Sequence, residues 1–390
     1  MIKYRNMLKH KSFFILAAVL VGIGIGVLIW KFLSPALGRG VFYFRIENDK
    51  ANLFLLKNSN SKNLVSLPAR EIDPGDFRPP KRSYISNSRE EMIYFKQVGE
   101  APVTGIGEGE NMEINRIIYK PILVDLEKNK ETEINQTMDP VGVIFSPNDS
   151  RIAWVKGIDE VTYQQIEESG EKREVWISEK DGQSPALLVG FDENLVILKR
   201  WAGNYIYFQG LWDAVNQSMG RINLETKQIE YLTPEGCGEM LENCKNIEFS
   251  PSGNKFLYEI ASKKDNKDIT ELYLGDFETK QYLAVLTTDQ IGNRLWIDDG
   301  QRFFYTEQVA DKQGNVIETI HFVDMKNQTD DSIYSGNYIS ELTFDSAGRY
   351  LYFLEKQKEG NDFNLTRLDL KTRENEIILT DNYNKVLLVQ

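Results

Sequence analysis

The chain has 390 residues and carries 58 Asp and Glu against 46 Lys and Arg, a formal net charge of −12. Such an acidic surface repels the phosphate backbone of nucleic acids, which argues against DNA or RNA as a partner. Hydrophobic residues make up 41% of the sequence and charged residues 27%. These proportions are those of a folded protein and exclude a mainly disordered chain.

A long uncharged segment lies close to the N-terminus. Residues 13–30 read FFILAAVLVGIGIGVLIW, and as a helix they would extend over roughly 27 Å, about the thickness of a bilayer core. Phe32 and Leu33 extend the buried stretch if Lys31 snorkels toward the headgroups. We therefore predict a basic leader over 1–12, a transmembrane signal-anchor helix over 13–33, a linker over 34–40 and a folded domain over 41–390.

The flanks of this segment predict its orientation. Basic residues at positions 3, 5, 9 and 11 precede it, which favours a cytoplasmic N-terminus and a folded domain outside the cytoplasm, extracellular or periplasmic. The protein would then be a single-pass protein of the cell membrane. A signal peptide cleaved near residues 34–36 is the alternative, but the long apolar run and Lys31 both argue against it.

Small residues recur every four positions in the same segment, at Ala18, Gly22 and Gly26. This spacing puts them on one face of a helix, where they allow a second helix to approach closely. It therefore raises a homodimer formed through the membrane helix as a hypothesis. The alternative is that small residues are simply common in transmembrane helices.

A repeated pattern runs through the rest of the chain. Phe145 begins FSPNDSRIAW, Phe249 begins FSPSGNKFLY and Phe344 begins FDSAGRYLYF. Each copy has an apolar first residue, a polar turn, an apolar residue seven positions on and an aromatic residue nine positions on. The pattern is typical of two strands joined by a turn. Looser copies begin at Ile85, at Trp296 and, with one inserted residue, at Leu198.

The spacing of the copies indicates the fold class. They recur about every 50 residues, which leaves room for four strands in each unit and is typical of a β-propeller. Residues 41–67 supply three strands without a first one, and residues 385–390 supply a lone strand. We predict that these terminal strands pair and close the ring. The expected fold is all-β, a seven-bladed propeller; six or eight blades are the alternatives, because the copy at Leu198 is degenerate.

The apolar–Ser–Pro turn followed by an apolar–aromatic strand resembles the WD-like repeats of the TolB-type propeller family, which also occur in dipeptidyl-peptidase-like proteins. The resemblance covers nearly all of residues 41–390 and implies a fold more than a function. The Gly-His and Trp-Asp pairs of true WD repeats are absent from the expected places, since Trp212-Asp213 lies in a loop, out of register.

The predicted loops differ between the two rims of the ring. Turns between the first and second strands are short, whereas the loops on the other rim are long. Binding residues are often on elaborated loops held by a rigid scaffold. We therefore expect a protein or ligand partner on the long-loop rim, and the opposite rim, which the linker enters, to face the membrane. The long segments are 97–116, 157–174, 209–220 and 308–314 within blades, and 69–83 and 235–245 between blades.

Two features of this rim are candidate site residues. Leu211 and Trp212 are apolar residues in a polar loop and could contact a partner, although they could equally pack within their own loop. Cys237 and Cys244 are the only cysteines and would form one disulfide in an oxidising compartment. In a reducing compartment they would be free thiols.

The sequence gives little sign of catalysis. His10 and His321 are the only histidines, no Gly-x-Ser-x-Gly occurs, and no Gly-rich loop follows a strand and opens a helix. We therefore expect no enzyme, no cofactor and no metal site, but a membrane-anchored extracytoplasmic module for protein or ligand binding, or a scaffold. The alternative is a propeller hydrolase that acts on a carbohydrate or lactone through carboxylates at the channel mouth.

Overall fold

A computed structural model describes most of the chain from residue 41 to residue 388. The predicted leader, membrane helix and linker, with Ala18, Gly22 and Gly26, lie outside the described residues. Within the described part, no helix has the length and apolar character needed to span a bilayer. The gaps in the description are 48–49, 58–59, 69–82, 108–109, 157–172, 194, 212–216, 235, 239–240, 242, 265–266, 289, 298–299, 311–315, 346–347, 359, 361 and 383–385.

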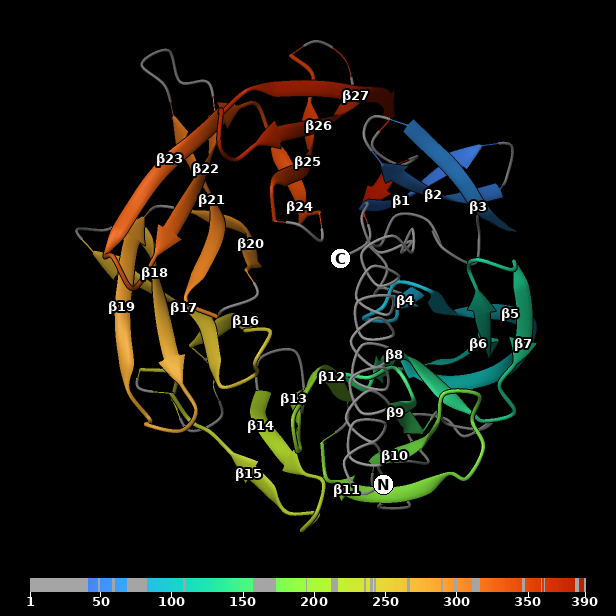
Figure 1. The fold of residues 1–390 in the computed structure, drawn as a ribbon. Coiled ribbons are helices and arrows are strands. Elements are labelled where there is room, and N and C mark those ends of the chain that lie inside the picture. The colour runs from blue at the N-terminus through green and yellow to red at the C-terminus, as the bar shows by residue number, and fades with distance from the viewer. Residues whose placement is uncertain are drawn as a thin grey trace, which may run out of the picture.

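The described strands form seven four-stranded antiparallel sheets arranged as blades around a central axis (Figure 1). This confirms the predicted all-β, seven-bladed propeller. From the axis outward, blade 1 holds β28 (Val386–Leu388), β1 (Val41–Glu47), β2 (Lys50–Lys57) and β3 (Asn60–Pro68). Blade 2 holds β4 (Ser83–Ile85), β5 (Glu91–Gly107), β6 (Glu110–Asp125) and β7 (Lys130–Glu133).

The other five blades each use four consecutive strands. Blade 3 holds β8 (Met138–Phe145), β9 (Arg151–Lys156), β10 (Arg173–Glu179) and β11 (Ala186–Phe191), and blade 4 holds β12 (Leu195–Ala202), β13 (Tyr205–Leu211), β14 (Gln217–Asn223) and β15 (Ile229–Tyr231). Blade 5 holds β16 (Cys244–Phe249), β17 (Lys255–Lys264), β18 (Lys267–Asp276) and β19 (Tyr282–Thr288). Blade 6 holds β20 (Ile291–Trp296), β21 (Arg302–Ala310), β22 (Val316–Asp324) and β23 (Thr329–Gly336), and blade 7 holds β24 (Ile339–Phe344), β25 (Tyr350–Lys356), β26 (Asp362–Asp369) and β27 (Asn375–Asn382).

The two ends of the described chain meet in blade 1. β28 pairs antiparallel with β1, from Tyr43 opposite Leu388 to Arg45 opposite Val386. The last strand of the chain is therefore the innermost strand of the blade that the first strand began. The Arg45 Nε also donates a hydrogen bond of 2.9 Å to Asp381 Oδ2 in blade 7. This pairing leaves no open sheet edge where the ring closes.

The repeated turn is explained by one buried hydroxyl. Ser86, Ser146 and Ser250 each follow the apolar first residue of a copy and are buried. The Oγ of each accepts a hydrogen bond from the backbone N–H five residues on, at 3.1, 3.0 and 3.2 Å respectively. In blade 7, Asp345 has this role and accepts from the backbone N–H groups of Arg349 and Tyr350.

The fifth residue of a copy has a left-handed backbone conformation. The φ angle is positive at Arg89, Asp149, Gly253, Gly300 and Gly348. Glycine adopts this region without strain, and aspartate tolerates it better than most residues. The turn therefore requires a left-handed fifth residue, and Gly or Asp adopts that conformation with less strain than Arg89 does.

The copy predicted to begin at Leu198 was placed wrongly. Leu198 pairs with Phe208 inside the sheet, and a bulge lies between Leu198 and Arg200. β12 continues to Ala202, and a two-residue turn with Gly203 at a φ of 53° leads into β13. Trp201, opposite Ile206, therefore holds the place that the apolar first residue holds in other blades. The shorter turn and the bulge together account for the irregular spacing in the sequence.

The segment 97–116, expected as a loop, is also different. β5 and β6 run through it as a paired ribbon, from Ala101 opposite Arg116 to Gly107 opposite Glu110. Its glycines and Pro102 suggested a loop, but the backbone ladder continues past them. The predicted loops 209–220 and 308–314 are likewise shorter, because strands extend to Leu211 and Ala310 before them.

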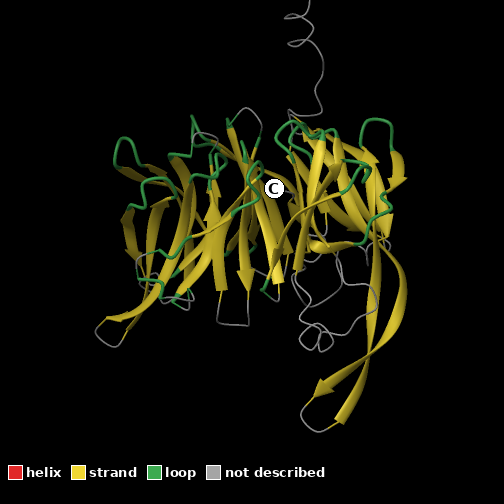
Figure 2. Ribbon diagram, turned by 90° about the horizontal axis from the view of Figure 1, so that it is seen from below, coloured by secondary structure: helices red, strands yellow, loops and turns green. Residues whose placement is uncertain are grey.

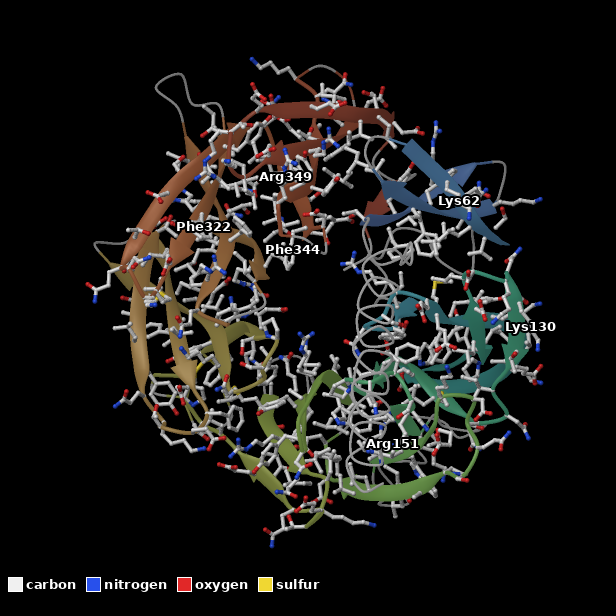
Figure 3. The ribbon with its side chains drawn as sticks, in the orientation of Figure 1. Lys62, Lys130, Arg151, Phe322, Phe344 and Arg349 are labelled. Carbon is white, nitrogen blue, oxygen red and sulfur yellow. A yellow bond between two sulfur atoms is a disulfide. The ribbon has the colours of Figure 1, made fainter. Side chains whose placement is uncertain are left out.

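The hydrophobic core lies between the blades. Phe42 and Phe44 of blade 1 pack with Met92 and Tyr94 of blade 2. Blade 1 packs its other side on blade 7, where Tyr43 joins a cluster with residues of β25 and β26. Figure 3 shows Phe344 at the inner margin of blade 7, whereas Lys62 and Lys130 lie on outer strands. Each blade therefore depends on its neighbours to cover its apolar faces.

A pair of glycine substitutions tests the turn. Gly253 and Gly348 have φ angles of 76° and 64°, so alanine at either position costs about 1 kcal/mol in backbone strain. A Cβ on Gly253 would also collide with the ring of Tyr207, whereas no atom of the described residues lies within 4 Å of one on Gly348. We expect urea unfolding to show a loss of about 1 kcal/mol for Gly348→Ala and about 2–4 kcal/mol for Gly253→Ala. Equal losses would contradict this account of the turn.

Candidate functional site

The site residues predicted from sequence lie in different places. Leu211 is the half-buried last residue of β13 and pairs with Gln217, and Trp212 lies outside the described residues. Cys237 and Cys244 form a disulfide in the connection between blades 4 and 5. Gln217 lies between the two features, because it pairs with Leu211 and also donates a hydrogen bond to the backbone oxygen of Cys244.

The disulfide fixes the entry to β16. Both cysteines are buried and pack with Leu241 and Ile247 in a core cluster. The Gln217 Nε2 donates hydrogen bonds to the backbone oxygens of Leu241 and Cys244, at 3.1 and 2.5 Å. The connection is therefore held to blade 4 at the point where the innermost strand of blade 5 begins.

The innermost strands are irregular in the same way. β8, β12, β16, β20 and β24 each have a shift in pairing register with the next strand outward. Such bulges change the direction of nearby side chains and are common next to functional sites.

Charged residues gather on the inner part of blades 4 to 6. We call Lys199, Asn246, Glu248, Glu259 and Arg294 the inner charge cluster. Glu259 of blade 5 forms an ion pair with Nη1 of Arg294 in blade 6, and both side chains are almost fully buried, 6% and 10% exposed. The Asn246 Nδ2 donates a hydrogen bond of 2.9 Å to the other oxygen of Glu259.

The cluster interrupts the apolar pattern of the repeat. Arg294 lies two residues before the apolar residue that ends its strand, where Val143 and Leu342 are fully buried in blades 3 and 7. At the position equivalent to Glu259, blade 3 has Val155 and blade 7 has Leu354, and both are fully buried. Replacing apolar contacts by a buried ion pair seldom adds stability. Residues that break the rule of their own fold in this way are candidates for function.

The cluster was missed in the sequence because the copies were aligned on their turns. The signal was present in the strand before each turn. In blade 3 the two residues before Phe145 are Val and Ile, whereas in blade 6 the two residues before Trp296 are Arg and Leu. Comparing those positions would have identified Arg294 as an exception.

The charges of the cluster influence one another. Lys199 reaches solvent, but protein surrounds most of it, so desolvation lowers the pKa of its ammonium group while the charge of Glu248 opposes that shift. Burial likewise lowers the pKa of Arg294, to about 10, and Glu248 again opposes the shift. The carboxylate of Glu248 therefore acts electrostatically on both cations.

A second polar group joins blades 6 and 7. The Oε2 of the buried Glu318 accepts a hydrogen bond of 2.8 Å from the backbone N–H of Ile339. Burial raises the pKa of Glu318, although hydrogen bonds from Thr306, Ile339 and Gln308 oppose this. The Asn293 Nδ2 donates to the backbone oxygen of Ile339 at 3.1 Å. These contacts position the start of β24.

His321 lies away from the inner charge cluster, on the third strand of blade 6. Its ring stacks on Tyr305 with centroids 4.7 Å apart, and its Nδ1 is 3.0 Å from Asp330 Oδ1. Burial pushes the pKa of Asp330 upward, but hydrogen bonds from His321 and Tyr305 outweigh this and lower it. Within the described ranges, no three His, Cys, Asp or Glu side chains are arranged to hold a metal ion.

Comparison with known proteins supports the fold. No protein-family model matches this chain, and no curated protein matches its sequence. A prolyl endopeptidase is similar in structure, with a TM-score of 0.58 and 10% identity over 90% of this chain and 49% of that one. The β-propeller domain of the Trilobed protease from Pyrococcus furiosus has a TM-score of 0.50 and 13% identity, over 76% of this chain and 85% of the other.

TolB from Acinetobacter baumannii is also among the similar structures. It has a TM-score of 0.39 and 15% identity, over 74% of this chain and 68% of that one. At such identities, structural similarity establishes the propeller fold alone. A TM-score this low adds nothing to that assignment, so function has to be argued from the residues of this chain.

A double-mutant cycle tests the buried ion pair. Arg294→Leu leaves the Glu259 carboxylate buried without its cation and should cost about 3–5 kcal/mol in the free energy of unfolding. Adding Glu259→Leu gives both positions the leucine that blade 7 has at the equivalent places, Leu342 and Leu354, and should recover most of that loss. Lys120→Ala is the control, because Lys120 and its partner Glu133 are about half exposed and the pair contributes at most about 1 kcal/mol.

Urea unfolding at neutral pH compares the wild type, the two single variants, the double variant and the Lys120→Ala control. If the double variant is as unstable as Arg294→Leu alone, the two residues do not form the pair described above.

Proposed function

We propose that this chain is a binding or scaffold module that engages a protein or ligand partner on its loop rim, the rim that carries the hairpins between second and third strands. The supporting observation is the arm, the part of β5 and β6 between residues 97 and 118. β5 has 17 residues and β6 has 16, and Figure 2 shows their hairpin extending beyond the other strands. An arm of this kind adds little to the ring but offers surface to a partner.

The edges of the arm favour this proposal. β5 pairs with β4 only between Met92 and Tyr94, and β6 pairs with β7 only from Ile122 to Asp125. Among the described strands, none pairs with either edge of the arm between residues 97 and 118. Unpaired backbone N–H and C=O groups at a strand edge readily accept an added strand from another chain.

The arm would gain stability from a partner. A two-stranded hairpin alone is marginally stable in water. A chain that adds a strand to either unpaired edge would supply backbone hydrogen bonds and stabilise the arm.

The proposal includes the membrane anchor over 13–33, with the N-terminus in the cytoplasm and the propeller outside. β1 is second from the axis in its blade, as β5 is, so Val41 begins at the rim opposite the arm. An anchor before Val41 would hold that opposite rim toward the membrane and direct the arm away from it. The Cys237–Cys244 disulfide suits an oxidising compartment. Dimerisation through Ala18, Gly22 and Gly26 is part of the same hypothesis.

On this proposal the chain is not an enzyme and needs no cofactor. The competing hypothesis is a hydrolase for a carbohydrate or lactone, which requires carboxylates that act together near the axis. Glu248 is the exposed carboxylate of the inner charge cluster, and Glu259 is held by Arg294 and Asn246. A Glu248→Gln variant that abolishes turnover in a substrate screen would favour this hydrolase.

Shortening the arm tests the binding proposal. Replacing residues 98–118 by Asn-Gly joins Gln97 to Tyr119, which are already paired, and should leave the ring folded. The matched control replaces residues 262–269 in the hairpin of β17 and β18, between the paired Ala261 and Thr270. Partners are captured on the tagged full-length protein in its native membrane and identified by mass spectrometry.

We expect the intact protein and the control to retain the same partners, and the arm-shortened protein to lose them while keeping its thermal stability. Retention of the same partners by the folded arm-shortened protein would contradict the proposal.

A further inference from the structure

We propose that Glu193 is the centre of a binding site for a primary ammonium group, at the seam between blades 3 and 4 on the loop rim. Glu193 is in the connection from β11 to β12, and the site around it uses Ser218 of β14 and Tyr231 of β15. The arm belongs to blade 2, so this proposal and the partner proposed for the arm are tested separately.

Glu193 is a buried carboxylate without a cationic partner among the described residues. It is 2% exposed, and the Ser218 Oγ donates a hydrogen bond of 2.8 Å to its Oε1. Its Oε2 is enclosed and accepts no hydrogen bond from any described residue. By contrast, the similarly buried Glu259 forms an ion pair with Arg294. A buried carboxylate with no positive charge beside it is costly, and a cation at Oε2 would offset that cost.

Blade 4 is shaped to bring this carboxylate close. Gly210 and Ser218 are cross-strand partners on the face toward blade 3. A Cβ on Gly210 would lie 2.8 Å from the Cγ of Glu193, so glycine leaves the space that the glutamate occupies. Two residues back on the same face, the ring of Phe208 meets that of Phe191 edge-on, with centroids 4.7 Å apart. Glu193 is therefore held against blade 4 by the packing that joins the two blades.

Tyr231, on the outermost strand of blade 4, is the exposed neighbour of this carboxylate. It pairs with Gly220 on the same face, and its ring meets that of Phe208 edge-on, with centroids 5.8 Å apart. Its side chain is half exposed. Burial raises the pKa of its hydroxyl, and the charge of Glu193 raises it further. We expect Tyr231 to rotate as an ammonium group enters, which would then meet an aromatic ring and a carboxylate together.

The described charges at this seam leave one negative charge to be neutralised. Asp192 is exposed and adjacent to Glu193 in the chain, and its charge also raises the pKa of Tyr231. Arg173 is opposite Phe191 in the sheet and brings one positive charge to the same end of blade 3. Two carboxylates against one guanidinium leave a charge of −1, which a monovalent cation would neutralise.

The free oxygen determines what kind of cation fits. A guanidinium binds best through two parallel hydrogen bonds to both oxygens of a carboxylate, but Oε1 of Glu193 already accepts from Ser218. A divalent metal ion takes about six oxygen ligands, and the described residues hold no three His, Cys, Asp or Glu side chains that could bind one. An ammonium group is a compact charge that one free carboxylate oxygen can accept. The site should therefore prefer a primary amine.

Two kinds of molecule carry such a group. One is a small amine, and the other is a protein whose lysine side chain reaches the loop rim. Methylammonium is the probe for the first source and Nα-acetyl-lysine amide for the second. Guanidinium is the probe for a cation of the same charge and the wrong shape.

The experiment measures binding to the full-length protein by saturation-transfer difference NMR. The methyl signal of methylammonium is followed during titration at neutral pH and constant ionic strength, and the other two probes are compared as competitors. The variants are Glu193→Gln and Tyr231→Leu. Glu225→Gln is the matched control, because Glu225 is an exposed glutamate of the same blade, in the turn after β14 at the opposite rim. Thermal unfolding of each protein without probes is the second readout.

We expect saturable methylammonium binding that is at least about tenfold weaker in Glu193→Gln and about threefold weaker in Tyr231→Leu, but unchanged in Glu225→Gln. Guanidinium should compete at least about tenfold less well than Nα-acetyl-lysine amide. Without probes, Glu193→Gln should unfold at the same or a higher temperature than the wild type, because the substitution removes an unpaired buried charge. A merely structural glutamate would instead be destabilised by this substitution.

Tighter binding of Nα-acetyl-lysine amide than of methylammonium assigns the site to a protein lysine, and equal or weaker binding assigns it to a small amine. Binding that never saturates, equal competition by guanidinium, or binding that persists unchanged in Glu193→Gln would overturn the proposal. Tyr231 is half exposed, so Tyr231→Leu should fold even if Glu193→Gln does not. Unchanged binding in Tyr231→Leu would then overturn the proposal by itself.

Discussion

Closure of the ring is the constraint on which the rest of this structure depends. Every blade has two apolar faces, and each face is covered only by a neighbouring blade. Blade 1 packs on blade 2 through Phe42 and Phe44, and on blade 7 through Tyr43. Its innermost strand comes from the other end of the chain, as three residues of β28 paired with β1. That short pairing joins the two halves of blade 1, so the packing on both of its sides depends on it.

A closed ring also limits where buried charged residues and unpaired strand edges can be accommodated. Residues between blades must be apolar for the ring to pack, and the repeat follows that rule with Val143 and Leu342. Arg294 and Glu259 break it, and they do so at the inner margin, where bulged strands approach the axis. The arm breaks a different rule, because it leaves strand edges unpaired beyond the ring. The two exceptions lie on different blades.

The sequence predicted the features that repeat. An apolar residue, a Ser or Asp side chain that accepts backbone hydrogen bonds and a left-handed fifth residue define the same turn in several blades, so the strand spacing and the seven blades could be deduced. The copy in blade 4 does not follow this spacing, because its turn is shorter and a bulge in β12 adds a residue to the strand before it. The arm was misread because Gly and Pro suggest loops locally, whereas a backbone ladder can propagate through them. Arg294 and Glu259 were missed because they are far apart in sequence and meet only across two blades.

The most direct test of the account is amide hydrogen exchange of β1 in the full chain and in a chain that ends at Asn382, before β28. If β28 completes blade 1, the amides of Tyr43 to Arg45 are protected in the full chain, and the shortened chain loses that protection first at β1 and at the face of blade 7 against it. Equal protection of β1 in the two proteins would contradict the closure described above, and with it the arrangement of the blades around the axis.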